Sequence, residues 1–201
     1  MRPATAVDLF WIPLGSGNHW VRLNGKVFEA ASAFLERRSR CDLYHTALEV
    51  AVPDGRFVIE MTPIPDRRRE RGVVGEGAVG TKWAGRYRLF RYENRRWLDG
   101  IIPDIGDAVS GPVRVTSDEA RAHSILELVP SVPTPVWGRD ELDAGEMWSS
   151  NSVISWLLAS SGVDMDQIRA PFEGRAPGWD AGIVVARRDS ISLSRKFERS
   201  I

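Results

Sequence analysis

Cysteine is almost absent from this chain of 201 residues, whose only cysteine is Cys41. A single cysteine excludes an intramolecular disulfide framework, a CxxC redox pair and a zinc site of the CxxC type. The three histidines are scattered and no HExxH motif is present, which argues against a zinc-dependent hydrolase. We therefore expect neither a metal nor a cofactor.

Long apolar runs and an excess of one charge are also missing. No apolar stretch is long enough to span a bilayer, and no signal-peptide core follows the N-terminal residues. Lys+Arg and Asp+Glu both number 27, so the overall balance suggests neither nucleic acid nor an anionic membrane surface as a partner. The basic run at 67–71 is interpreted as a solvated loop. These absences predict a soluble, cytoplasmic protein and leave its oligomeric state open.

What is present is typical of a globular protein. Apolar residues make up 43% and charged residues 27% of the chain, and its length fits a single domain over residues 1–201. The eight tryptophans are interpreted as core and pocket lining.

Apolar periodicity and capping residues predict the main elements. The predicted helices and strands are a strand at 7–13, a helix at 24–38, a hairpin at 44–60, a strand at 86–93, helices at 116–129 and 150–161, and a last strand at 182–187. About three helices and about five strands, with the middle strands joined as a hairpin, indicate an α+β fold with an antiparallel sheet.

The hairpin at 44–60 carries the first chemical signal. Two β-branched-rich runs are joined by Asp54-Gly55, a strong hairpin signal. If these two residues form the loop, Glu49 lies opposite Glu60 on the neighbouring strand.

Side-chain alternation then places His45, Glu49 and Glu60 on one face of this ribbon. A histidine whose ring is oriented by a carboxylate is two thirds of a nucleophilic triad. Glu60 is preferred as the orienting carboxylate because it can lean across from the neighbouring strand, and Glu49 is the alternative. A half-buried hairpin with one polar histidine at its edge is the purely structural interpretation.

A second signal lies at residues 148–158, where small hydroxyl residues precede an apolar helix. A helix N-terminus offers unpaired N–H groups and a partial positive charge, which favour an anionic nucleophile and an oxyanion. The structural alternative is equally physical, because Ser149 or Ser150 is also a good N-cap.

Together these segments resemble the circularly permuted papain-like folds, namely the NlpC-like amidases, the lecithin:retinol acyltransferase-like group and the PPPDE peptidases. The resemblance covers residues 43–62 and 147–158. It places His45 on the histidine strand, Glu60 as the third residue and Ser150 at the position of the nucleophilic cysteine. It implies a hydrolase or acyl-transfer enzyme that acts on an amide or ester bond of a small-molecule, peptide or acyl substrate.

The chain departs from these families at the nucleophile, because they attack with a thiolate and this chain has Ser150. Cys41 lies on a connector and not at a helix start, so it does not replace the missing thiol. A serine needs a general base to remove its proton during attack. The alternatives are a Ser-His-Glu enzyme, a cysteine changed to serine to silence the site, and a non-catalytic module of the same fold that binds a peptide or acyl ligand. A plain structural or partner-binding α+β domain is the remaining alternative.

Residues 173–182, rich in Gly, Pro and Trp, are interpreted either as a rigid turn or as a pocket wall. In the second case the planar fork of Arg175 could hold a carboxylate. The candidate substrate-binding residues are Trp148, Asn151, Arg175, Trp179 and His19.

Overall fold

The structure is a computed structural model, and it describes residues 4–14, 39, 41–64, 72–102 and 104–198. The predicted helix at 24–38, the candidate His19 and the basic run at 67–71 lie outside these described residues.

A six-stranded antiparallel sheet forms the centre of the described structure, with strand order β4-β5-β3-β2-β1-β6. Its strands are β1 (Ala6–Pro13), β2 (Tyr44–Val52), β3 (Gly55–Pro63), β4 (Val73–Ala78), β5 (Arg91–Leu98) and β6 (Val113–Thr116). The α-helices are α2 (Glu119–Leu128), α3 (Ser150–Ser160) and α4 (Trp179–Glu198). The predicted α+β class and antiparallel sheet are therefore confirmed, with one strand more than the five expected.

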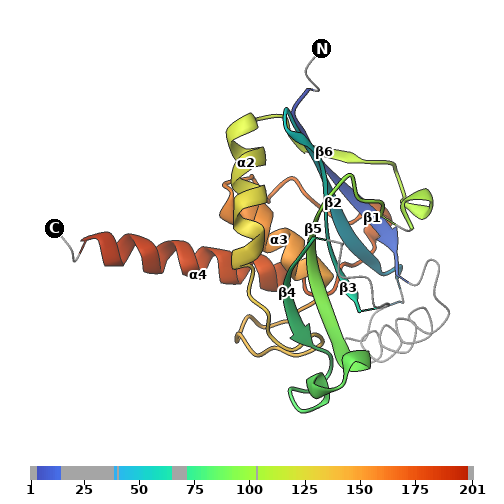
Figure 1. Ribbon diagram of the computed structural model, residues 1–201, viewed down its shortest axis with the longest axis vertical. Helices are drawn as coiled ribbons and strands as arrows, with labels where there is room; N and C mark the ends of the chain where they lie inside the picture. Colours follow the sequence, from blue (N-terminus) through green and yellow to red (C-terminus); the bar gives the residue numbers. More distant parts are fainter. Residues whose placement is uncertain (1–3, 15–38, 40, 65–71, 103, 199–201) are drawn as a thin grey trace.

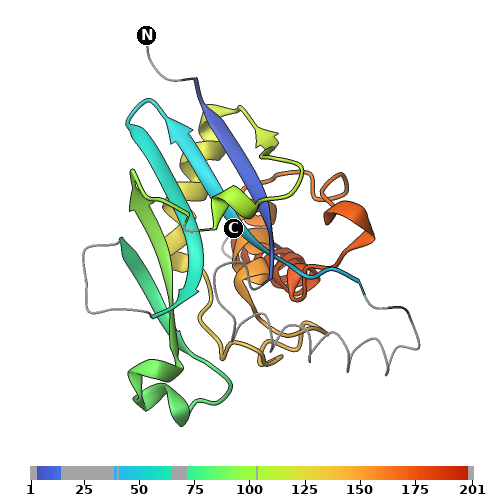
Figure 2. The ribbon, with the colours of Figure 1, turned by 90° about the vertical axis from the view of Figure 1, so that its right-hand side faces the viewer.

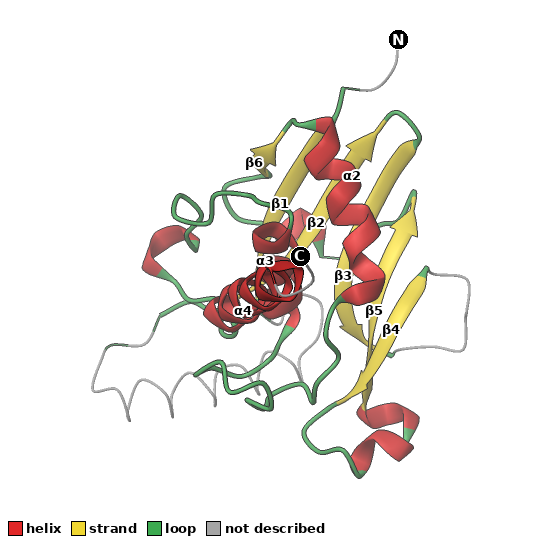
Figure 3. Ribbon diagram, turned by 90° about the vertical axis from the view of Figure 1, so that its left-hand side faces the viewer, coloured by secondary structure: helices red, strands yellow, loops and turns green. Residues whose placement is uncertain are grey.

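The helices lie on one side of the sheet, which we call the helix face (Figures 1 and 3). The opposite side, the outer face, is turned toward the viewer in Figure 2. Strand alternation sends the odd residues of β1 and the even residues of β2 into the main core with α2 and α3. A smaller apolar cluster of Phe10, Ile12, Ala47, Val58 and Ile102 lies on the outer face.

The hairpin forms, but its turn differs from the prediction. Val52 pairs with Gly55, so Pro53 and Asp54 occupy the loop and Glu49 lies opposite Val58. Proline is preset for the first loop position, and Gly55 has a φ of 145°, a conformation that side chains disfavour. The register moves by two residues, which leaves Glu60 on the same face as His45 and Glu49.

Two strand predictions are wrong in position. The segment at 182–187 lies within α4, because a short apolar run does not by itself distinguish a strand from a buried helix. The strand predicted at 86–93 begins only at Arg91, after the 3₁₀ turns η1 (Ala84–Arg86) and η2 (Arg88–Phe90). Among the described residues no helix is long and apolar enough to cross a membrane.

Candidate functional site

The start of α3 is built around Ser149, which is the N-cap. Its hydroxyl accepts a hydrogen bond from the Asn151 N–H at 3.1 Å, and its own N–H donates to Ser152 Oγ at 2.9 Å. This reciprocal pair is a capping box, so two otherwise unpaired backbone N–H groups are satisfied. The predicted capping role of Ser149 is confirmed.

The serines of α3 also hold the segment that leads into α4. Three hydroxyls donate to three successive carbonyl oxygens: Ser149 to Pro177 at 2.7 Å, Ser152 to Gly178 at 2.6 Å and Ser155 to Trp179 at 2.7 Å. These serines therefore have a structural role, because their hydrogen bonds join the beginning of α4 to α3.

Asn151, predicted to bind substrate, is engaged by the fold. Its side-chain amide donates to the carbonyl oxygens of Tyr44 at 3.0 Å and Pro177 at 2.9 Å. Its Oδ1 accepts from the Thr46 hydroxyl at 3.0 Å. Both amide hydrogens are used, so Asn151 joins α3 to β2 and to the segment before α4.

Strand alternation places His45 on the opposite face of the sheet from α3 and Ser150. Ser150 is the first residue of α3, on the helix face, and only 6% of it is exposed. Thr46 reaches α3 through Asn151, so alternation directs its neighbour His45 to the outer face. Ile12, which pairs with His45 across the ribbon, belongs to the apolar cluster on that outer face.

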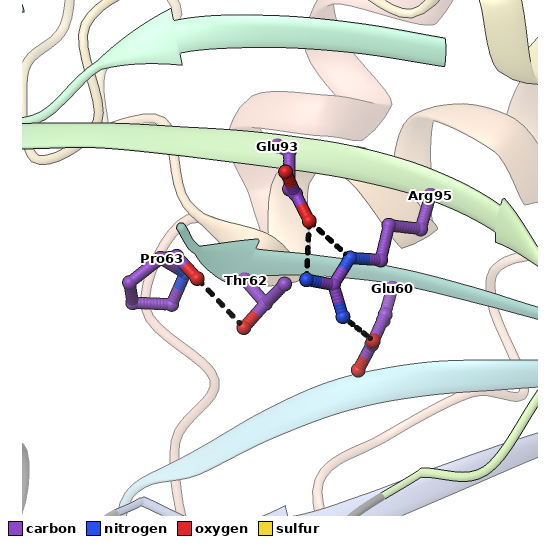
Figure 4. Close-up of polar contacts among 5 residues, drawn as sticks. All are labelled: Glu60, Thr62, Pro63, Glu93 and Arg95. Carbon is purple, nitrogen blue, oxygen red and sulfur yellow. Dashed lines mark hydrogen bonds and ion pairs between the residues drawn. The ribbon is translucent and has the colours of Figure 1, made fainter. Parts of the chain in front are cut away.

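Glu60, the predicted third residue, is held by an arginine. Glu60 and Arg95 are register partners on β3 and β5, and Arg95 Nη1 donates to Glu60 Oε1 at 3.0 Å. The same guanidinium binds Glu93, so one buried cation bridges two buried carboxylates (Figure 4). The alternative carboxylate, Glu49, forms an ion pair with Arg56 at 2.7 Å.

Desolvation is the cause that shifts the pKa of His45. Burial lowers its pKa from 6.5 to about 4. A carboxylate that oriented the ring would favour the charged form and raise the pKa. The ring is therefore neutral at neutral pH.

We expect this shift to make the protein less stable in mild acid. The unfolded chain binds a proton at His45 below about pH 6.5, whereas the folded chain resists it down to about pH 4. The free energy of unfolding should thus fall by about 2 kcal/mol between about pH 7 and about pH 5. Urea denaturation at both pH values measures the effect.

The variant His45→Asn should remove most of this pH dependence. His123→Asn is the matched control for the substitution itself, since this side chain is 39% exposed and does not share the burial of His45. An unchanged slope in His45→Asn would contradict the assignment.

A pocket of about 540 Å³ lies beside the start of α4, and it contains two of the predicted substrate-binding residues, Arg175 and Trp179. The segment that carries Arg175 is fixed to the sheet, because its N–H donates to Asp42 O and its carbonyl accepts from Tyr44 N. The other lining residues are Trp11, Glu146, Met165, Asp166, Ile168, Arg169, Ala170, Ala176, Asp180, Ile183, Val184 and Arg187.

Two tryptophans form an apolar wall of this pocket. The rings of Trp11 and Trp179 lie 5.0 Å apart at an interplanar angle of 44°. Trp179 is 8% exposed, and its indole N–H is buried without a hydrogen-bond partner. Trp148, another predicted substrate-binding residue, does not line this pocket, and its buried indole N–H also has no partner.

Glu146 supplies a carboxylate that the sequence analysis missed. Burial raises the pKa of this carboxyl above its ordinary value, and hydrogen bonds from the backbone N–H groups of Gly178 and Asp180 oppose the rise. Arg175 opposes it as well. Glu146 thus lies at the N-terminus of α4, where the helix dipole favours a negative charge.

The pocket lining carries equal numbers of both charges. Its cations are Arg169, Arg175 and Arg187, and its carboxylates are Glu146, Asp166 and Asp180. Such a lining matches a ligand that has an apolar body and carries both a positive and a negative group. In the part of the chain that the structure describes, no group of three His, Cys, Asp or Glu residues could hold a metal ion.

No protein-family model, curated protein or solved structure matches this chain. The functional argument therefore depends on the site itself.

Proposed function

We propose that the protein is a non-catalytic binding module whose pocket beside α4 receives a short peptide with free termini. In this proposal the chain is a member of the permuted papain-like fold that has lost the catalytic arrangement. That relationship is supported only by the resemblance of residues 43–62 and 147–158 to those families.

What supports a non-catalytic role is the placement of the predicted triad. His45 and Ser150 lie on opposite faces of the sheet, and Glu60 is held by Arg95. Ser150 is thus separated from the base that the predicted triad assigned to it, and a serine that no base deprotonates is a poor nucleophile. The other serines at this helix start bind backbone groups, which accounts for them without chemistry.

The lining of the pocket carries the peptide proposal. A volume of about 540 Å³ is within the range of small-ligand pockets, about 300–1,000 Å³. A free carboxylate would bind the guanidinium of Arg175, whose planar fork suits it. The peptide ammonium would bind near Asp180, and an apolar side chain would pack against Trp11. An acyl ligand carries only a negative group, so it would offer no positive group to Asp180.

The test measures binding of alanyl-phenylalanine and of its N-acetylated and C-amidated forms by calorimetry with the full chain. We expect the free dipeptide to bind and each blocked form to bind about tenfold more weakly, since each loses one charge-assisted contact. Arg175→Gln should weaken binding of the free dipeptide while leaving that of the C-amide almost unchanged. Asp180→Asn should weaken binding of the free dipeptide while leaving that of the N-acetylated form almost unchanged.

Arg121→Gln and Glu127→Gln are matched controls, because both residues are exposed on α2 and outside the pocket. Equal binding of free and blocked dipeptides, or no binding at all, would reject the proposal. Cleavage of the dipeptide that disappears in Ser150→Ala would instead support the Ser-His-Glu hydrolase.

A further inference from the structure

The connection between β4 and β5 exposes a group of large apolar side chains. We call residues 81–90 the tip; it contains η1 and η2 and projects beyond the end of the sheet (Figures 1 and 3). Its exposed fractions are 62% for Trp83, 52% for Tyr87, 82% for Leu89 and 45% for Phe90. Scattered apolar side chains are common on surfaces, whereas a contiguous exposed patch marks an interaction site.

The tip has a defined shape. Its base is closed by the Val79 N–H, which donates to Phe90 O at 2.8 Å. The rings of Tyr87 and Trp83 meet edge-on, with their centroids 5.7 Å apart. The guanidinium carbon of Arg86 lies over the Trp83 ring, 4.6 Å from its centroid. The aromatic side chains are thus held in place before any partner binds.

The tip is also basic. Lys82, Arg86 and Arg88 lie within it, Arg91 follows directly, and residues 77–92 include no Asp or Glu. Two acids approach from outside, since Glu141 pairs with Lys82 at 3.3 Å and Glu76 pairs with Arg91. The stretch 77–92 itself thus carries four cations and no carboxylate, although the net charge of the whole chain is zero.

We propose that the tip docks onto an anionic lipid surface. Tryptophan and tyrosine rings are favoured at the level of lipid headgroups, and leucine and phenylalanine at the boundary with the acyl chains. Arginine and lysine side chains next to them bind the phosphates and are attracted by the negative surface potential.

Other partners fit the tip less well. Bases of single-stranded nucleic acid could stack on its aromatic rings, but Leu89, the most exposed apolar residue of the tip, has no aromatic face. The tip is a projection, whereas such nucleic acids are bound in basic grooves. In a second copy of this chain the facing tip would carry the same positive charge, which opposes self-association through it.

This docking surface is independent of the peptide proposal. The tip lies between β4 and β5, whereas the pocket is lined by residues of α4 and the segment before it. Failure of either proposal therefore leaves the other untouched.

The test is cosedimentation of the full chain with vesicles of phosphatidylcholine that contain about 30% phosphatidylglycerol, an anionic lipid. We expect binding to these vesicles at low salt and at least tenfold weaker binding to vesicles of phosphatidylcholine alone. Raising the salt to about 0.5 M should weaken the anionic binding strongly, because it screens the basic side chains.

The variants separate the tip from other exposed residues. Leu89→Ser and Trp83→Ser should each weaken anionic-vesicle binding by about tenfold, since each removes an inserted apolar group. Ile101→Ser is the matched control: it is 66% exposed but follows the opposite end of β5, and its binding should equal that of the parent chain.

Three results would overturn the proposal. The first is equal binding to neutral and anionic vesicles, or none to either. The second is an equal loss in Ile101→Ser and Leu89→Ser. The third is absent vesicle binding together with a different activity of the tip. That activity would be binding of fluorescent oligouridine, or concentration-dependent self-association seen by light scattering, that Trp83→Ser abolishes. The tip would then bind RNA or a second copy of the chain.

Discussion

Replacing Arg95 by methionine should lower the free energy of unfolding by about 3–5 kcal/mol. The Arg95 side chain is 4% exposed and bridges Glu60 and Glu93, whose side chains are 10% and 9% exposed. Methionine fills a similar volume but removes the cation that both buried carboxylates bind. Urea denaturation at neutral pH measures the loss.

The exposed pair of Arg114 and Asp8 provides the matched control. Arg114 is 53% exposed and binds Asp8 through two hydrogen bonds, yet exposed ion pairs contribute only about 0–1 kcal/mol. Arg114→Met should therefore cost much less than Arg95→Met. Adding Glu60→Gln and Glu93→Gln to Arg95→Met should recover most of its loss, because the two carboxylates that the guanidinium bound are then neutral amides. Equal costs for the two arginine variants would refute the assigned burial of this network.

Local signals in the sequence predicted the elements that have strong local rules. The Asp54-Gly55 turn signal gave the hairpin, and the serines before α3 gave a correct cap. The strands β4 and β6 were missed, because one is rich in glycine and the other has only four residues. The helix α4 was mistaken for a strand where its apolar residues are consecutive.

The predicted triad depended on a fact that alternation cannot supply. The sequence indicates that His45 and Glu60 share a face, and the two-residue shift of register preserves this. The sequence does not indicate which face of the sheet the helices cover. Because adjacent residues of a strand point to opposite faces, a difference of one residue decides whether a side chain faces the helices. Thr46, not its neighbour His45, directs its side chain toward α3, where it donates to Asn151.

The sequence predicted the pocket residues that are close together in the chain but not those that packing brings in from elsewhere. Arg175 and Trp179 stand four residues apart in a segment whose composition suggested a pocket wall, and both line the pocket. Trp11 and Glu146 come from distant parts of the chain, β1 and the segment before α3. Their convergence follows from the packing of α4, for which no local pattern gave a signal.

That packing depends on Gly182, and Gly182→Ala should lower the free energy of unfolding by about 3 kcal/mol. A Cβ atom there would lie 2.1 Å from Ser155 Oγ and 2.2 Å from the backbone oxygen of Ser152. The serine hydroxyl can rotate away, but the carbonyl belongs to α3 and cannot. Helix propensity alone predicts the opposite sign, a gain of about 1 kcal/mol for alanine.

Thermal and urea denaturation of Gly182→Ala measure the sign of the change in the free energy of unfolding. A loss indicates that close packing of α3 and α4 dominates, and a gain indicates that helix propensity does. Gly106→Ala is the control, because a Cβ atom there meets nothing within 4 Å and should alter stability little. A stabilised Gly182→Ala would mean that α3 and α4 are farther apart than described. Displacement of α4 also moves Trp179 and Arg187 in the pocket lining, so the destabilised variant should bind alanyl-phenylalanine more weakly even where it remains folded.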